Sequence, residues 1–178
     1  GLVNALAYTP MGGLVLPVET SIYDGKGDFK ITGMIGQSME ESVNVAYSYI
    51  CSNKNDFKIK EDFMNNKDLH IHFLEGAVKK DGPSAGVTMV TALVSALSNK
   101  KVKHNVAMTG EVTLTGRVLP IGGLKEKSLA AVRAGIDTII IPKDNEKDID
   151  KIPASIKKGL KIISAEQIDT VLNNAIMQ

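Results

Sequence analysis

Cysteine is nearly absent from this sequence: Cys51 is the only one among 178 residues. A disulfide within the chain is therefore excluded, and a lone cysteine favours a reducing compartment. An excess of either charge is also missing, because 21 Lys and Arg residues face 20 Asp and Glu residues, for a net charge of +1. Without a basic field, neither a nucleic acid nor an anionic membrane is expected as a partner.

Targeting and membrane-spanning patterns are missing as well. The N-terminal stretch GLVNALAYTPMGG has no basic start followed by a long apolar run, so no signal peptide is predicted. The uncharged stretch from Gly82 to Asn99 is too rich in Ser, Thr and Gly for a membrane span. Because the sequence does not begin with Met, we expect it to be a fragment or a processed piece of a longer protein.

The phosphate-binding pattern G-x-x-x-x-G-K-[S/T] does not occur. Its nearest approach, Gly25-Lys26-Gly27, lacks the glycine five positions before Gly25 and the hydroxyl after Lys26. ATP is therefore not expected to have a site in these residues, and no other cofactor is expected to bind them.

Hydrophobic residues make up 43% of the sequence and recur at strand and helix spacings, which is typical of a globular protein. The pattern predicts a mixed α/β (α+β) fold but not its strand order. The predicted strands are Asn4–Thr9, Gly13–Tyr23, Phe29–Ile35, Leu69–Phe73, Asp137–Ile141 and Leu160–Ser164, with further strands within Val102–Leu119, broken at Gly110 and Gly116. The predicted helices are Ser38–Asn53, a buried helix that begins at Pro83, Leu124–Ala134 with Gly135 as C-cap, a polar helix after Pro142, and Ala165–Met177.

The segment K-K-D-G-P-S-A-G-V (residues 79–87) contains a G-x-S-x-G match around Ser84, a pattern that often surrounds a nucleophilic serine. Pro83 suits the first position of a helix, which makes Gly82 the N-cap. The backbone N–H groups of Ser84 and Ala85 then lack acceptors within the helix, and could stabilise an oxyanion. Taken alone, the match is equally well interpreted as the start of a tightly packed helix.

A histidine base for Ser84 is not apparent. His104 is the only histidine after Ser84, and no acidic residue lies between them. His70 and His72 precede Ser84 on alternate positions of one predicted strand. They are better interpreted as solvated residues of a strand face than as metal ligands, because one cysteine and three histidines make a poor ligand set.

Lysine is the remaining candidate base. Lys125 and Lys127 lie at the start of a predicted helix, directly after the glycine-rich turn of residues 120–123. A lysine has an ordinary pKa of about 10.4 and acts as a base near neutral pH only when burial lowers that value. Lys127 shares its helix face with several alanines, which mildly favours it over Lys125. Solvation of both lysines remains open at this point.

Three motifs, D-G-P-S-A-G (81–86), M-T-G-E (108–111) and P-I-G-G-L-K-E-K (120–127), in this order and spacing resemble the proteolytic domain of Lon proteases, which are ATP-dependent peptidases. Matches at residues 12–20, 70–77 and 134–142 extend the resemblance over nearly the whole chain. It implies a fold like domain 2 of ribosomal protein S5 and one proteolytic domain over residues 1–178. By the same resemblance, we expect the AAA+ motor and the N-terminal substrate-binding domain of the family to be absent from this chain.

The resemblance also implies a chemistry, that of a serine endopeptidase with a Ser–Lys dyad. Ser84 matches the nucleophile, Lys127 matches the base, and Thr109 matches a threonine beside the lysine amine. By the same resemblance we expect a hexamer that degrades unfolded, misfolded or tagged proteins, with ATP and Mg²⁺ bound only by the motor. The expected location is the cytoplasm, or the mitochondrial matrix for a eukaryotic source.

Asp81, three residues before Ser84, has two interpretations. It helps the start of a helix electrostatically, or it is a switch whose carboxylate swings toward Lys127 and keeps that amine charged. Two other functions also remain open. One is a non-catalytic S5-like binding module in which Ser84 only caps a helix; the other is a Ser–Lys hydrolase of non-peptide esters or amides.

Overall fold

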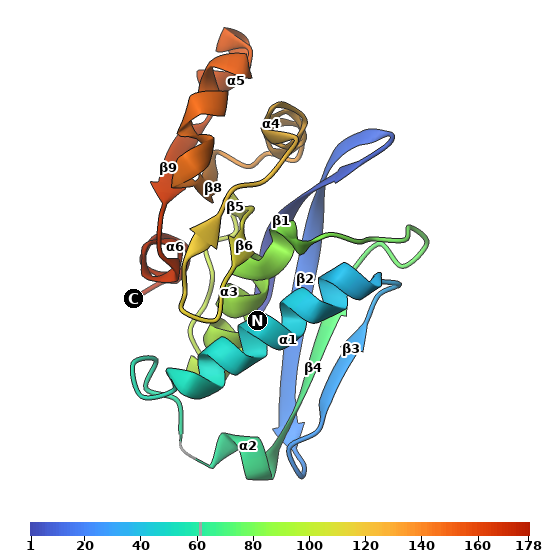
Figure 1. The fold of residues 1–178 in the computed structure, drawn as a ribbon, viewed down its shortest axis with the longest axis vertical. Helices are drawn as coiled ribbons and strands as arrows, with labels where there is room; N and C mark the ends of the chain where they lie inside the picture. The colour runs from blue at the N-terminus through green and yellow to red at the C-terminus, as the bar shows by residue number, and fades with distance from the viewer. Residues whose placement is uncertain (61) are drawn as a thin grey trace.

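The computed structural model describes residues 1–60 and 62–178 and has a seven-stranded mixed sheet at its centre, in the order β3-β4-β2-β1-β5-β8-β9 (Figure 1). The strands of this sheet are β1 (Leu2–Thr9), β2 (Gly12–Asp24), β3 (Phe29–Thr32), β4 (Lys67–Phe73), β5 (Val106–Met108), β8 (Thr138–Pro142) and β9 (Lys161–Ala165). β2 pairs antiparallel with β1 and β4, whereas β5 pairs parallel with β1 and β8. A separate antiparallel pair is formed by β6 (Glu111–Val112) and β7 (Val118–Leu119).

The helices of the described residues are α1 (Gln37–Ser52), α2 (Phe63–Asn66), α3 (Gly86–Ser98), α4 (Leu124–Arg133), α5 (Ala154–Lys157) and α6 (Ile168–Ala175), with 3₁₀ segments η1 (Pro83–Ala85) and η2 (Lys143–Lys151). None of them combines the length and the apolar character that a bilayer crossing requires. Together with the sheet they confirm the predicted mixed α/β fold.

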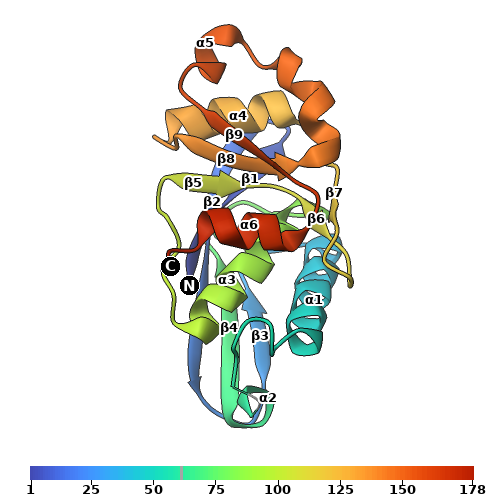
Figure 2. The same ribbon diagram turned by 90° about the vertical axis from the view of Figure 1, so that its left-hand side faces the viewer.

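Neighbouring residues on the central strands belong to two different cores. Met108 and Ile140 lie in the larger core with residues of α3 and α6, whereas Ala107 and Ile139 lie in the smaller core with residues of α4. Successive side chains of a strand point to opposite faces, so α3 and α6 cover one face of the sheet and α4 covers the other. Figure 2 shows α6 and α3 in front of the strands. Ser84, just before α3, and Lys127, on α4, therefore belong to segments on opposite faces of the sheet.

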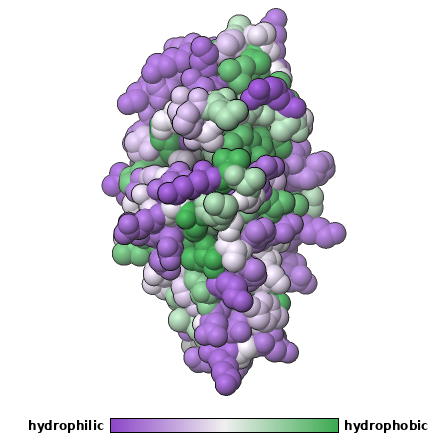
Figure 3. Space-filling model, turned by 90° about the vertical axis from the view of Figure 1, so that its right-hand side faces the viewer, coloured by the Kyte–Doolittle hydropathy of each residue, from purple (hydrophilic) through white to green (hydrophobic). Residues whose placement is uncertain are grey.

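The half of the sheet formed by β3, β4 and β2 buries one face only. Val18 of β2 is buried, whereas the alternate residues Glu19, Ser21 and Tyr23 are exposed, as expected for an antiparallel pair with one solvated face. Figure 3 views the molecule from this side: its narrow lower end is mostly hydrophilic, and apolar residues gather nearer the middle.

Several predicted element bounds were wrong, each for a local reason. The strand at Phe29 ends at Thr32 because Gly33 and Met34 take positive φ angles of 121° and 54°. The polar segment after Pro142 is the 3₁₀ helix η2 followed by the short α5. The last helix begins at Ile168, because Ala165 still pairs with Pro142 as the end of β9.

The uncharged helix after Pro83 is buried as predicted, but its first residues are not α-helical. Residues 86–95 are all buried, since α3 packs between the sheet and its neighbouring helices. Pro83–Ala85 form a 3₁₀ turn, and the α-helix begins only at Gly86. Ser84 thus lies in a tight turn immediately before the helix rather than in the first turn of the α-helix itself.

Candidate active site

Glycines shape the turn that carries Ser84. Gly82 has φ 113° and ψ 158°, a conformation that residues with a side chain rarely adopt, and it turns the chain into Pro83. At Gly86, an added Cβ would lie 2.8 Å from the backbone nitrogen of Val112, so the missing side chain lets β6 approach. The Ser84 side chain remains partly exposed, and Ala85 is buried.

Backbone hydrogen bonds fasten this turn to the residues that follow β5. The Gly110 N–H donates to the Ser84 carbonyl at 2.7 Å, and the Val87 N–H donates to the Gly110 carbonyl at 3.1 Å. Thr109 is itself tied to β8, because its N–H donates to the Ile140 carbonyl at 3.1 Å. The position of Ser84 is therefore set by the end of a central strand.

Lys127 lies on α4 with only 2% of its surface exposed, whereas Lys125 is exposed. The choice that helical periodicity left open between the two lysines is thus decided, as far as burial is concerned. The Lys127 Nζ donates to Thr109 Oγ1 at 3.0 Å, and no carboxylate within residues 1–60 and 62–178 forms an ion pair with it. Burial without a counter-charge lowers the pKa of Lys127 to about 8.

Thr109 links the two halves of the site. It is 1% exposed, its hydroxyl oxygen accepts from Lys127, and the same hydroxyl donates to the Ser84 carbonyl over a long 3.4 Å. Among the described residues, no hydrogen bond joins Ser84 Oγ directly to Lys127 Nζ. Catalytic hydrogen bonds are often long in unliganded enzymes and shorten once substrate is bound.

Ser84 and Lys127 line one cavity of about 420 Å³. Pro83, Ala85 and Asp81 lie on the side of Ser84, and β1 and β2 contribute apolar residues such as Leu6 and Leu16. The loop of residues 120–123 forms a further wall. A partly exposed hydroxyl thus shares a largely apolar hollow with a buried amine of lowered pKa, which is an arrangement suited to nucleophilic catalysis.

Sequence comparisons identify the family. The model of the "Lon protease (S16) C-terminal proteolytic domain" matches residues 1–178. This chain belongs to that family. It is 61% identical to the Lon protease of Clostridium acetobutylicum over 177 residues, 57% identical to that of Geobacter metallireducens over 176, and 55% identical to Lon protease 1 of Bacillus subtilis over 177. Each match covers 99% of this chain and 21–23% of the relative, so the chain spans under a quarter of their length.

Asp81 of this Lon proteolytic domain lines the same cavity as Lys127, but its carboxylate caps a helix that is distant in the sequence. Its Oδ1 accepts from the N–H groups of Gly82 at 2.8 Å and Met39 at 3.0 Å, and these donors hold the pKa of Asp81 below its ordinary value. Met39 lies in the first turn of α1, whose own N-cap, Gly36, has no side chain to offer. Asp81 therefore caps the start of α1 through Met39, and its second bond is to Gly82, the N-cap of η1.

Lys80 is a buried residue that the sequence analysis missed. It is 5% exposed, and its Nζ donates to three backbone carbonyls, those of Gly33, Glu75 and Val78, at 2.7–2.8 Å. Burial lowers the pKa of Lys80. The ammonium fixes the chain just before Asp81. Two adjacent lysines look like solvated residues in a sequence, so no local signal distinguishes Lys80 from Lys79.

The histidines take no part in the cavity of this Lon domain. His70 Nε2 and His72 Nδ1 lie 2.8 and 2.7 Å from Thr32 Oγ1, on the open face of the sheet. In the described part of the chain, no group of three or more His, Cys, Asp or Glu side chains is arranged to hold a metal ion.

Proposed function

We propose that residues 1–178 are the single proteolytic domain of an ATP-dependent Lon protease, and that it hydrolyses peptide bonds with a Ser84–Lys127 dyad. Membership of a family whose relatives are named Lon protease supports peptidase activity. The observation that carries the dyad is the burial of Lys127, whose pKa of about 8 leaves an appreciable neutral fraction near pH 7 in the cavity that Ser84 lines.

In the proposed reaction, neutral Lys127 takes the hydroxyl proton of Ser84 as Oγ attacks the carbonyl carbon of the substrate. The tetrahedral oxyanion accepts hydrogen bonds from backbone N–H groups around Ser84, and the N–H of Ala85 is the proposed donor. Charged Lys127 then gives its proton to the departing amine, leaving an acyl ester on Ser84. Water attacks this ester with Lys127 again as base, which releases the acid and restores both side chains.

Thr109 is proposed to orient the amine of Lys127 in this reaction. A buried amine needs hydrogen-bond partners. Thr109 Oγ1, 3.0 Å from Lys127 Nζ, is one such partner and brings no negative charge. A carboxylate in that place would raise the pKa of Lys127 and protonate the base. A neutral hydroxyl holds the nitrogen and leaves its proton affinity low.

The experiment that tests this function is labelling of Ser84 with a peptide phosphonate at different pH values. We expect labelling to rise roughly tenfold per pH unit below pH 8 and to level off above it, because only neutral Lys127 activates the serine. Mass spectrometry of the labelled peptide identifies the site, with Ser84→Ala as control. A binding module would not label, and a preference for esters over peptides would point to a non-peptide hydrolase.

Asp81 is proposed as a switch of the same site. Leaving the α1 cap for Lys127 would keep the amine charged and silence the base. The charge-free variant Asp81→Asn, whose amide oxygen still caps α1, is then expected to move the acid limb of the kcat/KM profile to lower pH. The measurement is the pH dependence of peptide cleavage by both proteins. Superimposable profiles would rule the switch out.

The wider assembly is proposed from the family alone. We expect a hexamer whose AAA+ motor, with ATP and Mg²⁺, feeds unfolded, misfolded or tagged polypeptides to this domain. Nucleic acid and membrane are not proposed as partners of the domain. A location in the cytoplasm agrees with the reducing compartment that a single cysteine favours. Degradation of an unfolded protein by the motor-containing chain, with and without ATP, tests this part of the proposal.

A further inference from the structure

The loop of residues 120–123 lines two hollows of the molecule. These residues line the cavity of Ser84 and Lys127 on one side and a second hollow of about 530 Å³ on the other. Pro120 has no N–H to donate, and Gly122 and Gly123 have no side chains to pack. Gly123 takes φ 72°, a conformation open to few other residues. The Ile121 side chain, which packs against the smaller core, is the apolar anchor of the loop.

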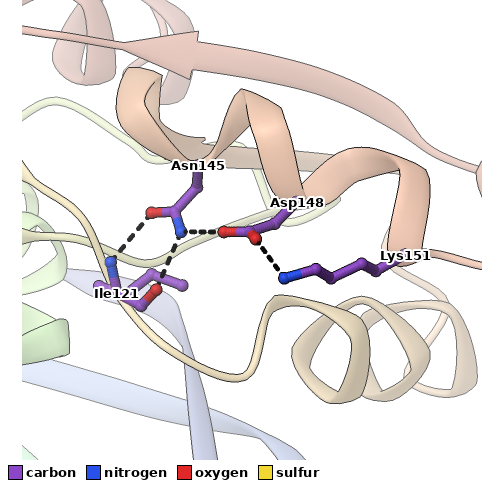
Figure 4. A network of polar contacts seen from close by, with 4 residues as sticks. All are labelled: Ile121, Asn145, Asp148 and Lys151. Atoms are coloured by element: carbon purple, nitrogen blue, oxygen red, sulfur yellow. Dashed lines mark hydrogen bonds and ion pairs between the residues drawn. The ribbon is translucent and has the colours of Figure 1, made fainter.

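One buried side chain holds the backbone of this loop. Asn145 on η2 is 1% exposed, and its Oδ1 accepts from the Ile121 N–H at 2.9 Å. Its Nδ2 donates to the Ile121 carbonyl at 2.9 Å and to Asp148 Oδ2 at 2.8 Å. Figure 4 shows the amide of Asn145 directed at both backbone groups of Ile121. A single side chain thus pairs with a loop residue as a neighbouring strand would.

The amide is itself held in place. Lys151 donates to Asp148 Oδ1 at 2.8 Å, so a chain of contacts runs from the surface through Asp148 to Asn145 (Figure 4). Because Asp148 accepts from Nδ2, the amide has its nitrogen toward the Ile121 carbonyl and its oxygen toward the Ile121 N–H. Both polar atoms of the Asn145 amide and both backbone groups of Ile121 thus have hydrogen-bond partners. Each bond fixes the orientation of the next.

We propose that Asn145 is a positioning residue that holds residues 120–123 as the wall of the cavity facing Ser84 and Lys127. The inference rests on the proposed peptidase function. Asn145 does not line the cavity itself and acts through Ile121. Lys127 does not depend on this loop for its position, because its helix α4 packs on β1 and β2 through the smaller core. Loss of the clamp is therefore expected to disturb substrate binding along the wall more than the chemistry of the dyad.

The test compares Asn145→Ala with the control Asp144→Asn. Asp144 is an exposed residue of the same 3₁₀ helix and takes no part in the contacts between Asn145 and Ile121. For cleavage of a short peptide, Asn145→Ala is expected to lower kcat/KM roughly tenfold or more, mainly through KM. Asp144→Asn is expected to match the parent protein. Amide hydrogen exchange of Ile121, followed by NMR, is expected to speed up at least tenfold in Asn145→Ala, which loses the acceptor of that N–H.

A second variant covers the case in which Asn145→Ala does not fold. Asn145→Asp keeps the size of the side chain and the acceptor for the Ile121 N–H, but it cannot donate to the Ile121 carbonyl and places two carboxylates together. We expect it to raise KM in the same direction. Folded variants with kcat/KM within twofold of the parent would overturn the inference, as would a loss confined to kcat or an equal loss in Asp144→Asn.

Failure of the inference and failure of the proposed function are distinguishable. If the parent protein cleaves peptides and labels at Ser84 while the Asn145 variants keep its KM, the inference alone is wrong. If the parent protein neither cleaves peptides nor labels at Ser84, the peptidase proposal is wrong and the inference falls with it.

Discussion

Replacing Lys127 with methionine or arginine is expected to lower kcat/KM for peptide cleavage about a thousandfold at pH 7, the scale of a lost general base. Methionine has a similar length and no basic atom. Arginine keeps the positive charge, but its guanidinium does not lose a proton at any working pH. Both variants therefore leave Ser84 without an acceptor for its hydroxyl proton, although one removes the charge and the other retains it.

Lys125→Met is the matched control for this experiment. Lys125 lies two residues earlier in α4 and is exposed, so its replacement changes the charge of the same helix without altering the buried amine. Peptide cleavage by this variant is expected to equal that of the parent protein. Steady-state cleavage of a fluorogenic peptide measures all three variants. An arginine variant that kept substantial activity would show that the role of residue 127 is charge and not proton transfer.

The local sequence singles out the residues that meet at the candidate site better than it predicts the support around them. Ser84, Thr109 and Lys127 each lie in a recognisable motif, and the helical pattern already favoured Lys127 as the more enclosed lysine. The mixed α/β fold was predicted from strand and helix spacings, and the structure confirms it. These properties depend on short stretches of sequence, which is why they could be predicted.

The residues that support the site depend on contacts between distant parts of the chain. Asp81 caps α1, 42 positions earlier at Met39, and Asn145 holds Ile121, 24 positions away. Lys80 Nζ donates to the carbonyl of Gly33, 47 positions earlier. Neither a periodicity nor a local motif indicates such pairings. The structural roles of Asp81, Asn145 and Lys80 could therefore not be predicted from the sequence.

Lys127→Met is also expected to stabilise the protein at pH 7 while it inactivates it. Lowering the pKa of Lys127 from 10.5 to about 8 means that the folded state holds the charged amine less favourably than the unfolded state does. At 1.36 kcal/mol per pKa unit, this penalty is about 3 kcal/mol wherever both states are protonated. Methionine removes the penalty but also the hydrogen bond to Thr109, worth about 1 kcal/mol. The expected net gain in unfolding free energy is about 2 kcal/mol.

The pH dependence of that gain identifies its origin. Between pH 8 and pH 10.5 the unfolded parent protein binds more protons at Lys127 than the folded one, so its stability rises with pH in this window. The advantage of Lys127→Met is therefore expected to be full at pH 7 and to fade by about pH 10.5. Urea unfolding of both proteins at pH 7 and pH 10 measures the difference, and other ionisations cancel because they are shared. A gain that stayed constant across this range would mean that packing, and not a buried charge, sets the stability at this position, and Lys127 would then lose its claim to be a base at neutral pH.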